Sequence, residues 1–393
     1  MANEENSEES GKIIQGDVSK NRVLSSLLWT FMEVGGTQII RFVVQIVLAR
    51  ILCPEDYGIM AIVFAFITIS DVFIKSGFNT ALVQKKDSDE LDFNSVFYLI
   101  FFISAVLYVI LFFTAPFIAS FYKMDLLKDI IRILSVVLFF DAVNAVQFAM
   151  VQKTMQFKKF FFSNMGGTIA SCAVGVVMAV KGFGVWTLVT QQLVNSFLIT
   201  LILWFTVKWR PKLQFSWSRL KHLFSFGWKL SLSAIIDVLY RQLYSLVIGK
   251  VFSKSELGEF NKGEQFPNMI EYTLDGSIQG VMLPTLSAYN GNPEKIKSIL
   301  RKTVTSSSYL IIACMFGMAA VSKNLVLVLL TDKWLGCVPF LMLSCLFYCL
   351  YPIQFSNQTA INAMGRSDIY LKLEIIKKVI GIVILFASIP FGL

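Results

Sequence analysis

The stretch RFVVQIVLARILCPEDYG, which runs from Arg41 to Gly58, places a charged arginine inside a long apolar segment. The segment begins near residue 23, so it predicts a helix over 23–49 that also contains Glu33. A membrane-spanning helix needs about 20 predominantly apolar residues. A charge inside such a helix is costly unless it is paired or solvated. The stretch therefore predicts a membrane span that contains a functional arginine.

The composition of the whole chain is that of a membrane protein. Of the 393 residues, 55% are hydrophobic and 16% are charged, whereas a soluble domain carries about 25% charged residues. Leu, Ile, Val and Phe dominate over Ser and Thr, which favours helices over a barrel with alternating polar residues. The net charge is +9, and the basic residues lie between apolar runs. Membrane topology explains this pattern better than nucleic-acid binding does.

Eleven segments are predicted to span the membrane. No connection between them is long enough for a separate folded domain, and the last segment reaches the end of the chain. We therefore expect at least a twelfth helix to be missing from this sequence. The eleven segments are 23–49, 57–83, 93–122, 130–151, 160–180, 182–207, 226–249, 266–289, 303–322, 334–365 and 379–393.

The distribution of lysine and arginine predicts the orientation. These residues are about twice as frequent in one set of connections as in the other. Cytoplasmic connections carry the excess, which places the N-terminus in the cytoplasm. Residues 1–22 are polar and acidic and lack the apolar core of a signal peptide. We expect them to form a disordered cytoplasmic tail.

The first stretch is repeated as RQLYSLVIGKVFSKSELG, at an offset of 200 residues. Six spans separate the two copies, so both have the same orientation. This predicts an all-α integral membrane fold of two six-helix bundles, related by a pseudo-twofold axis along the membrane normal. The second bundle is incomplete, with five spans. The matched pairs include Arg41 with Arg241, Gly58 with Gly258, Asp56 with Glu256, and Asp71 with Glu271.

The repeat divides the chain into an N-terminal lobe, 23–207, and a C-terminal lobe, 226–393. Between them, residues 208–225 form a basic linker, which we expect to lie at the cytoplasmic membrane interface, in part as a helix. Three tryptophans in and beside this linker suit such an interface, namely Trp209, Trp217 and Trp228.

One face of the first span is polar. Gln38, Arg41 and Gln45 are spaced so that they share this face, and Glu33 lies at a similar azimuth two turns before Arg41. Arginine binds phosphate bidentately, and glutamine can bond to sugars. The face is therefore a candidate cationic wall of a substrate cavity. The alternative is that Arg41 reaches the interface along its aliphatic stem.

The seventh span carries the matching residues. Asp237 and Arg241 are one helical turn apart and can pair directly, and Tyr240 and Tyr244 have the same spacing. They are candidates for the opposite wall of the cavity. The alternative is that the Asp237–Arg241 pair is structural.

Four acidic residues within predicted spans are candidates for coupling transport to a proton or Na⁺. They are Asp71, Asp141, Glu271 and Asp275. A carboxylate in a membrane can bind such an ion. The alternatives are solvation at helix ends, or a pair such as Asp71 with Lys75.

The sequence gives no sign of enzymatic chemistry. It has no phosphate-binding glycine-rich loop and no metal-ligand cluster, and its one histidine, His222, lies in the basic linker. We predict no cofactor beyond a coupling ion. The six cysteines form no CxxC pair and are expected to be mostly buried thiols. They are Cys53, Cys172, Cys314, Cys337, Cys345 and Cys349.

Several stretches resemble polysaccharide-export flippases of the multidrug/oligosaccharidyl-lipid/polysaccharide superfamily, in particular the Wzx-type and colanic-acid-exporter branch. These stretches are LCPEDYG, GFNTALVQKKD, GFGVWTLVTQQLV, KWRPKLQFSWSRLKHLFSFGWKL, DKWLGCVPFL and NAMGRSD. The resemblance implies a bacterial inner-membrane protein that flips an undecaprenyl-diphosphate-linked oligosaccharide by alternating access, for surface polysaccharide or lipopolysaccharide biosynthesis. It also implies membrane lipids, a polysaccharide polymerase and glycosyltransferases as partners.

Two other classes compete with this interpretation. An ion-coupled multidrug antiporter of the same superfamily would favour acidic cavity groups, against which the matched arginines argue. A membrane polysaccharide polymerase would need a large outer loop, and an O-acyltransferase would need a histidine within the membrane. The sequence shows neither feature.

Overall fold

The computed structural model describes the secondary structure of residues 20–75, 78–85, 88–289, 293–364, 366–388 and 390. Within some helices, as at Asp275, only the backbone is described. Of the predicted tail 1–22, residues 1–19 lie outside the described residues, whereas Lys20 already begins the first helix.

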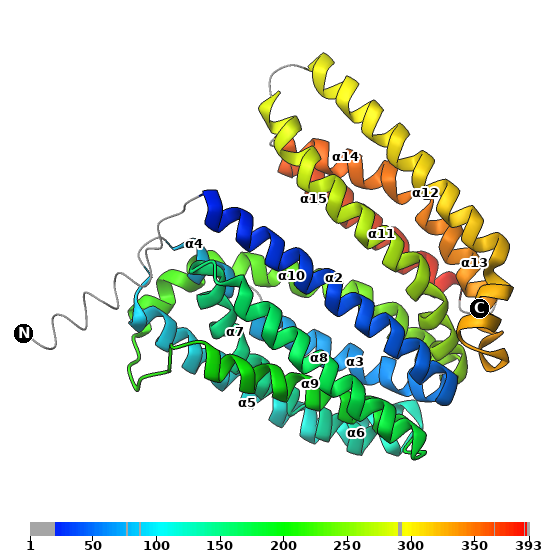
Figure 1. Cartoon of the computed structure of the whole chain (residues 1–393), viewed down its shortest axis with the longest axis horizontal. Helices are drawn as coiled ribbons and strands as arrows, with labels where there is room; N and C mark the ends of the chain where they lie inside the picture. The colour runs from blue at the N-terminus through cyan, green and yellow to red at the C-terminus, as the bar shows by residue number, and fades with distance from the viewer. Residues whose placement is uncertain are drawn as a thin grey trace, which may run out of the picture. The chain divides into compact units, whose positions relative to one another are not determined.

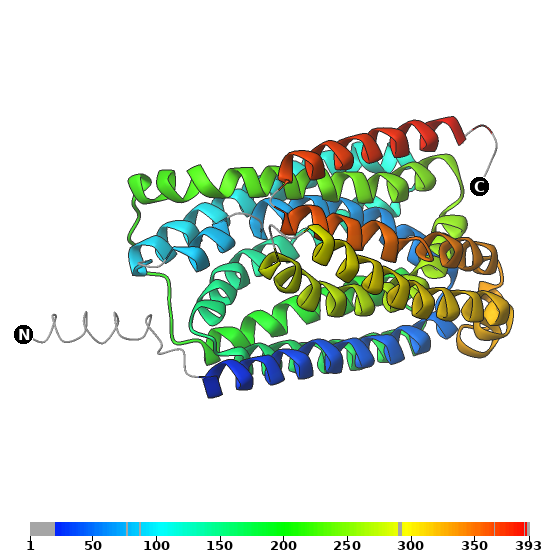
Figure 2. The ribbon, with the colours of Figure 1, turned by 90° about the horizontal axis from the view of Figure 1, so that it is seen from above.

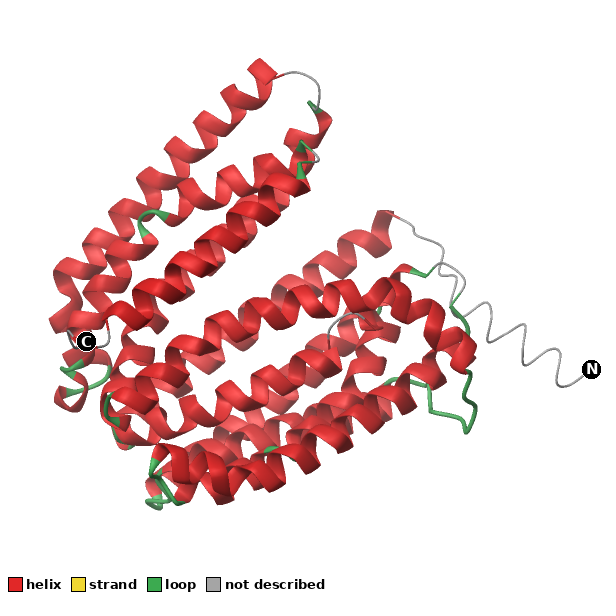
Figure 3. Cartoon of the chain, turned by 180° about the vertical axis from the view of Figure 1, so that it is seen from behind, coloured by secondary structure: helices red, strands yellow, loops and turns green. Residues whose placement is uncertain are grey.

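Throughout the described part of the chain the regular elements are helices, which confirms the all-α prediction (Figures 1 and 3). The α-helices are α2 (Lys20–Ile51), α3 (Pro54–Lys75), α4 (Phe78–Gln84), α5 (Glu90–Tyr122), α6 (Leu126–Leu134), α7 (Val137–Lys153), α8 (Phe157–Val180), α9 (Val185–Thr206), α10 (Trp217–Val251), α11 (Lys254–Ala288), α12 (Pro293–Leu329), α13 (Cys337–Tyr348), α14 (Tyr351–Ala363) and α15 (Ser367–Ser388), and η1 (Asp332–Trp334) is a 3₁₀ helix.

Eight helical segments of the described residues are long and apolar enough to cross a membrane. They are Pro54–Lys75, Glu90–Tyr122, Leu126–Lys153, Phe157–Val180, Val185–Thr206, Ser231–Val251, Glu294–Leu329 and Cys337–Ile361. The other three predicted spans fall in α2, α11 and α15, which are helical but outside this group. The total of eleven spans therefore stays a prediction.

The predicted segment 57–83 falls on α3 and α4, with residues 76–77 between them outside the described residues, and two further predicted segments are each divided within continuously described residues. The segment predicted over 130–151 consists of α6 and α7, because Ser135 and Val136 separate them. In α6 the side chains of Leu127, Ile130, Ile131 and Leu134 are buried, with the i, i+3, i+4, i+7 spacing of an amphipathic helix. The segment predicted over 334–365 likewise contains two helices, α13 and α14.

The predicted linker is helical in its second half. Helix α10 begins at Trp217, so the second half of the predicted linker 208–225 belongs to this helix. Residues 207–216 form the connection between α9 and α10.

The chain divides into two compact units. Unit 1 comprises Met1–Leu52 and Ile59–Leu246, and unit 2 comprises Cys53–Gly58 and Val247–Leu393. In unit 1, α8 packs against α2 and α9, and α7 packs against α5 and α9 (Figures 1 and 2). In unit 2, α11 and α12 both pack against α13 and α14.

The 200-residue repeat is visible in the local structure of one corner of the fold. Helices α2 and α10 end at Ile51 and Val251, and α3 and α11 begin at Pro54 and Lys254. The turns before α3 and α11 each contain an equivalent hydrogen bond. Cys53 N donates to Asp56 Oδ2 at 3.1 Å, and Ser253 N donates to Glu256 Oε2 at 2.8 Å. Matching residues therefore cap matching helices.

Within unit 2 the two copies meet at their matched glycines. A Cβ atom on Gly58 would collide with the carbonyl oxygen of Lys254, and one on Gly258 would collide with the carbonyl oxygen of Pro54. Pro54 and Lys254 are themselves a matched pair. The first turns of α3 and α11 thus cross at backbone contact, and the absence of a side chain at Gly58 and Gly258 permits it.

Candidate functional site

The residues of the predicted polar face of α2 differ in exposure. The side chains of Gln38 and Arg41 are exposed, and those of Glu33 and Gln45 are half-buried. Glu33 Oε1 accepts a hydrogen bond of 2.9 Å from Asn164 Nδ2 of α8. No carboxylate among the described side chains lies within ion-pair distance of the Arg41 guanidinium. The Arg41 charge acts on the Glu33 carboxylate only at longer range. Arg41 is thus a cation without a bound counterion in the described structure.

The matching face of α10 is neutralised. The Arg241 guanidinium lies 2.7 Å from Asp237 Oδ2, as the one-turn spacing predicted, and the Arg241 side chain is 73% exposed. The hydroxyl groups of Tyr240 and Tyr244 lie 3.2 Å apart. The two matched arginines therefore differ in their nearest anion.

Two of the predicted ion-coupling residues lie in one cluster. Lys75 Nζ lies 2.6 Å from Asp71 Oδ2, as their one-turn spacing allowed, and 3.2 Å from Asp141 Oδ2 of α7. Asp71 Oδ1 is buried and has no hydrogen-bond partner among the described atoms. Two carboxylates and one ammonium give the fully ionised cluster one net negative charge. The sequence did not predict that Asp141 would join this pair.

The other two acidic candidates, Glu271 and Asp275, belong to α11. The Glu271 side chain is buried. The side chain of Asp275 lies outside the described residues.

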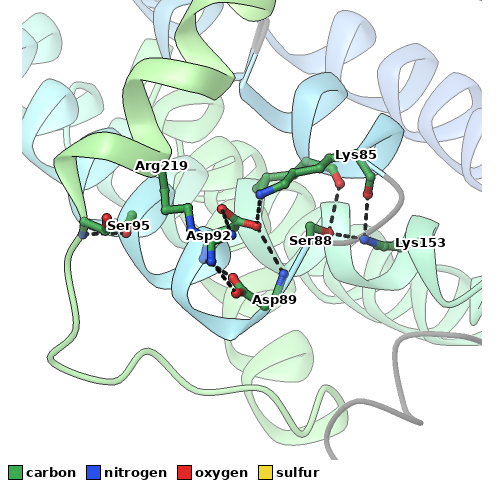
Figure 4. A network of polar contacts seen from close by, with 9 residues as sticks. Lys85, Ser88, Asp89, Asp92, Ser95, Lys153 and Arg219 are labelled. Carbon is green, nitrogen blue, oxygen red and sulfur yellow. Dashed lines mark hydrogen bonds and ion pairs between the residues drawn. The ribbon is translucent and has the colours of Figure 1, made fainter.

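A polar network at one end of unit 1 was missed by the sequence reasoning (Figure 4). At its centre Asp92 is fully buried. Its Oδ2 accepts a hydrogen bond of 2.5 Å from Lys85 Nζ, and Arg219 lies 3.7 Å from its Oδ1. Asp89 and Asp92 also form a capping box that begins α5. Partial burial opposes the ionisation of Asp89, but the hydrogen bond from Asp92 N and the Arg219 charge lower its pKa.

Lys153, at the end of α7, extends this network (Figure 4). Its ammonium donates to the carbonyl oxygen of Lys85 at 2.9 Å and to the hydroxyl of Ser88. The capping box could have been recognised from the sequence. The contributions of Lys153 and Arg219 could not, because they come from distant segments.

Unit 2 contains a buried lysine that the sequence had placed in an exposed connection. The Lys262 side chain is 4% exposed. Its Nζ lies 4.7 Å from the ring centre of Tyr57 and 5.9 Å from that of Trp334, a cation–π arrangement. Burial lowers the pKa of Lys262 to about 8.

The cysteines follow the prediction with one clear exception. Cys172, Cys337, Cys345 and Cys349 are buried and Cys314 is partly buried, whereas Cys53 is exposed. All six are free thiols.

A family model of polysaccharide biosynthesis proteins matches residues 47–339. The chain belongs to this family. The resemblance inferred from the sequence is thereby confirmed.

Relatives of named function include two polysaccharide-related proteins at 24% identity. The succinoglycan biosynthesis transport protein ExoT of Rhizobium meliloti (strain 1021) matches over 82% of this chain and 66% of its own length. The lipopolysaccharide biosynthesis protein WzxC of Escherichia coli (strain K12) matches over 84% and 68%. The chain therefore spans about two thirds of the length of these relatives.

Solved structures show the same fold. An inward-facing multidrug resistance MATE family transporter of the MOP superfamily matches with a TM-score of 0.68 at 15% identity, over 88% of this chain and 84% of its own. The lipid II flippase MurJ, in an inward closed conformation, matches with a TM-score of 0.68 at 16% identity, over 86% and 76%. With the eight apolar helical segments of its described residues, the chain is a multi-pass membrane protein of this fold.

Proposed function

We propose that this protein moves an undecaprenyl-diphosphate-linked oligosaccharide repeat unit across the bacterial inner membrane for surface polysaccharide biosynthesis. Membership of the polysaccharide biosynthesis family supports the pathway. The transporter fold, shared with a protein named as a lipid II flippase, supports transport rather than an enzymatic reaction. In this proposal the N-terminus is cytoplasmic, two helical bundles alternate in access, and a polymerase and glycosyltransferases are partners.

The observation that carries the proposal is Arg41, a cation in the first predicted span that no described carboxylate pairs with. The negative charge of a lipid diphosphate can compensate the positive charge of Arg41. Guanidinium groups bind phosphate oxygens through two parallel hydrogen bonds. Gln38 and Gln45, on the same face, supply donors and acceptors for sugar hydroxyls. Arg241 contributes less, because Asp237 already neutralises it.

The Asp71–Lys75–Asp141 cluster is the proposed site of ion coupling. Its fully ionised form carries one net negative charge, so a proton or Na⁺ bound there makes it neutral. Binding and release of that cation would change the electrostatic cost of the cluster within the membrane. Glu271, whose side chain is buried, and Asp275 are secondary candidates for the same role.

The substitution Arg41→Ala tests the proposal in cells that depend on this protein for surface polysaccharide. We expect polysaccharide to be lost while the amount of protein in the membrane stays the same, and lipid-linked repeat units to accumulate on the cytoplasmic leaflet. Arg50→Ala is the matched control, because Arg50 is an exposed arginine at the end of the same helix. Unchanged polysaccharide in the Arg41→Ala strain would contradict the role of Arg41.

An ion-coupled multidrug antiporter is the second candidate, because the fold also matches a multidrug resistance transporter. Deletion of the gene distinguishes the two functions. Loss of surface polysaccharide supports the flippase, and intact polysaccharide with increased drug sensitivity supports the antiporter.

A further inference from the structure

The connection between α9 and α10, residues 207–216, crosses one end of unit 1 as an irregular strap with a tight turn at Leu213, where Gln214 N donates to the carbonyl oxygen of Lys212 at 2.7 Å. Its backbone is held on one side by α5. Lys212 N donates to Asn94 Oδ1 at 3.0 Å, and Ser216 N donates to the hydroxyl oxygen of Ser95 at 2.9 Å. These bonds fix which side of the strap faces the protein.

The other side of the strap is apolar and open. Leu213 is 95% exposed, Phe215 is 53% exposed, and Trp217, the first residue of α10, is 68% exposed. The rings of Phe215 and Trp217 lie together, with their centres 6.3 Å apart, and Leu213 lies at the turn just before them. By contrast Trp209, at the start of the strap, is buried against the ring of Phe93. Three large apolar side chains are thus exposed on a segment whose backbone is anchored.

The strap is flanked by cations that the protein does not neutralise. Lys208 and Lys221 are exposed, and neither lies within ion-pair distance of a described carboxylate. Lys212 differs from them, because its ammonium lies 2.6 Å from Glu90 Oε2. Apolar side chains between uncompensated lysines match the chemistry of a membrane surface, where acyl chains lie below anionic headgroups.

We infer that the strap is a membrane-surface anchor that binds anionic phospholipid headgroups. Leu213, Phe215 and Trp217 enter the interface, where tryptophan is favoured. Lys208 and Lys221 contact the phosphate groups of acidic lipids. Because the hydrogen bonds to Asn94 and Ser95 hold the strap against α5, the anchor sets the depth of this end of unit 1 in the bilayer. This inference is independent of the transported substrate.

Spin labels on neighbouring residues test the apolar part of the anchor. Leu213→Cys and Gln214→Cys are labelled with a nitroxide in purified protein reconstituted into phosphatidylcholine–phosphatidylglycerol bilayers, with Cys53 and Cys314 replaced by serine. We expect the label at 213, at the tip of the turn, to collide more often with O₂ than with a water-soluble nickel chelate, and by a larger margin than the label at 214. High nickel accessibility at both positions would overturn the inference. Low accessibility to both reagents at 213 would also overturn it, because protein would then cover this side chain.

Lipid selectivity tests the cationic part. The retention of spin-labelled phosphatidylglycerol relative to phosphatidylcholine is measured for wild type and for Lys208→Gln and Lys221→Gln variants. Each substitution is expected to lower this ratio about five-fold, as a lysine near a membrane surface contributes about 1 kcal/mol. Lys128→Gln is the control, because Lys128 is an exposed lysine of α6. Equal ratios in all variants would overturn the assignment of the two lysines to anionic lipid.

Discussion

The Asp92 network and the polar face of α2 differ in whether the protein compensates their charges. Asp92 is fully buried, and it is surrounded by Lys85, Arg219 and a backbone N–H group of its own capping box. Arg41 is exposed, and no described carboxylate lies within ion-pair distance of it. The first region compensates its charges from within the protein. The second leaves its charge uncompensated by a described carboxylate, as the proposed binding of an anionic lipid requires.

The largest effect on stability is expected when the compensated region is broken. Asp92→Ala removes the buried carboxylate that Lys85 and Arg219 share, and loss of a hydrogen bond to a charged group costs about 1.5–3 kcal/mol. We therefore expect a lower thermal unfolding midpoint in detergent and less protein in the membrane. Asp129→Ala is the control, because Asp129 is an exposed acid of α6. An unfolding midpoint for Asp92→Ala as high as that of Asp129→Ala would remove the distinction between the two regions.

Lys262 is an intermediate case, buried like Asp92 but without a carboxylate partner among the described residues. Burial lowers its pKa from 10.5 to about 8, a difference that corresponds to about 3 kcal/mol at most. The unfolded chain binds more protons between these pH values, so wild-type stability should rise as the pH increases from about 8 to 10.5.

The substitution Lys262→Met should therefore stabilise the protein at pH 7 and abolish this rise. Unfolding midpoints in detergent, measured between pH 7 and 10.5, test both effects. Lys323→Met is the control, because Lys323 is exposed. A destabilised Lys262→Met variant would mean that the contacts with Tyr57 and Trp334 outweigh the cost of burying the charge.

The smallest effect on stability is expected at the Asp237–Arg241 pair. It is an ion pair like those of Asp92, but it is exposed like Arg41. Asp237→Ala removes the counterion of Arg241 and makes its environment similar to that of Arg41. In the water-filled cavity proposed for this face, loss of this exposed pair should change the unfolding free energy by less than about 1 kcal/mol. Denaturant unfolding of Asp237→Ala beside Asp92→Ala tests the difference. A cost similar to that of Asp92→Ala would show that exposure does not separate the two kinds of ion pair.

Features that depend on residues one helical turn apart could be predicted from the sequence. The Asp237–Arg241 and Asp71–Lys75 pairs and the contact between Tyr240 and Tyr244 follow from the helical period. The helix ends at the 200-residue offset also follow from the sequence, because matched residues cap them.

Features that depend on tertiary packing could not be predicted. Asp141 reaches Lys75 from α7, and Arg219 reaches Asp92 from α10. Lys262 has the sequence surroundings of an exposed lysine, and only the folded chain brings the rings of Tyr57 and Trp334 to it. Separate helices contribute to each of these sites, and no local spacing records which helices pack together.

The most direct test of the account is transport by the purified protein in vesicles. Movement of an undecaprenyl-diphosphate-linked oligosaccharide between leaflets is measured with a lectin that binds only the oligosaccharide on the outer surface of the vesicles. We expect wild type and Arg50→Ala to move the lipid at equal rates. Loss of a hydrogen-bonded charge should make Arg41→Ala roughly 10- to 100-fold slower. A wild-type rate for Arg41→Ala would contradict the account of the α2 face, and a wild-type protein that moves no lipid would contradict the proposed function itself.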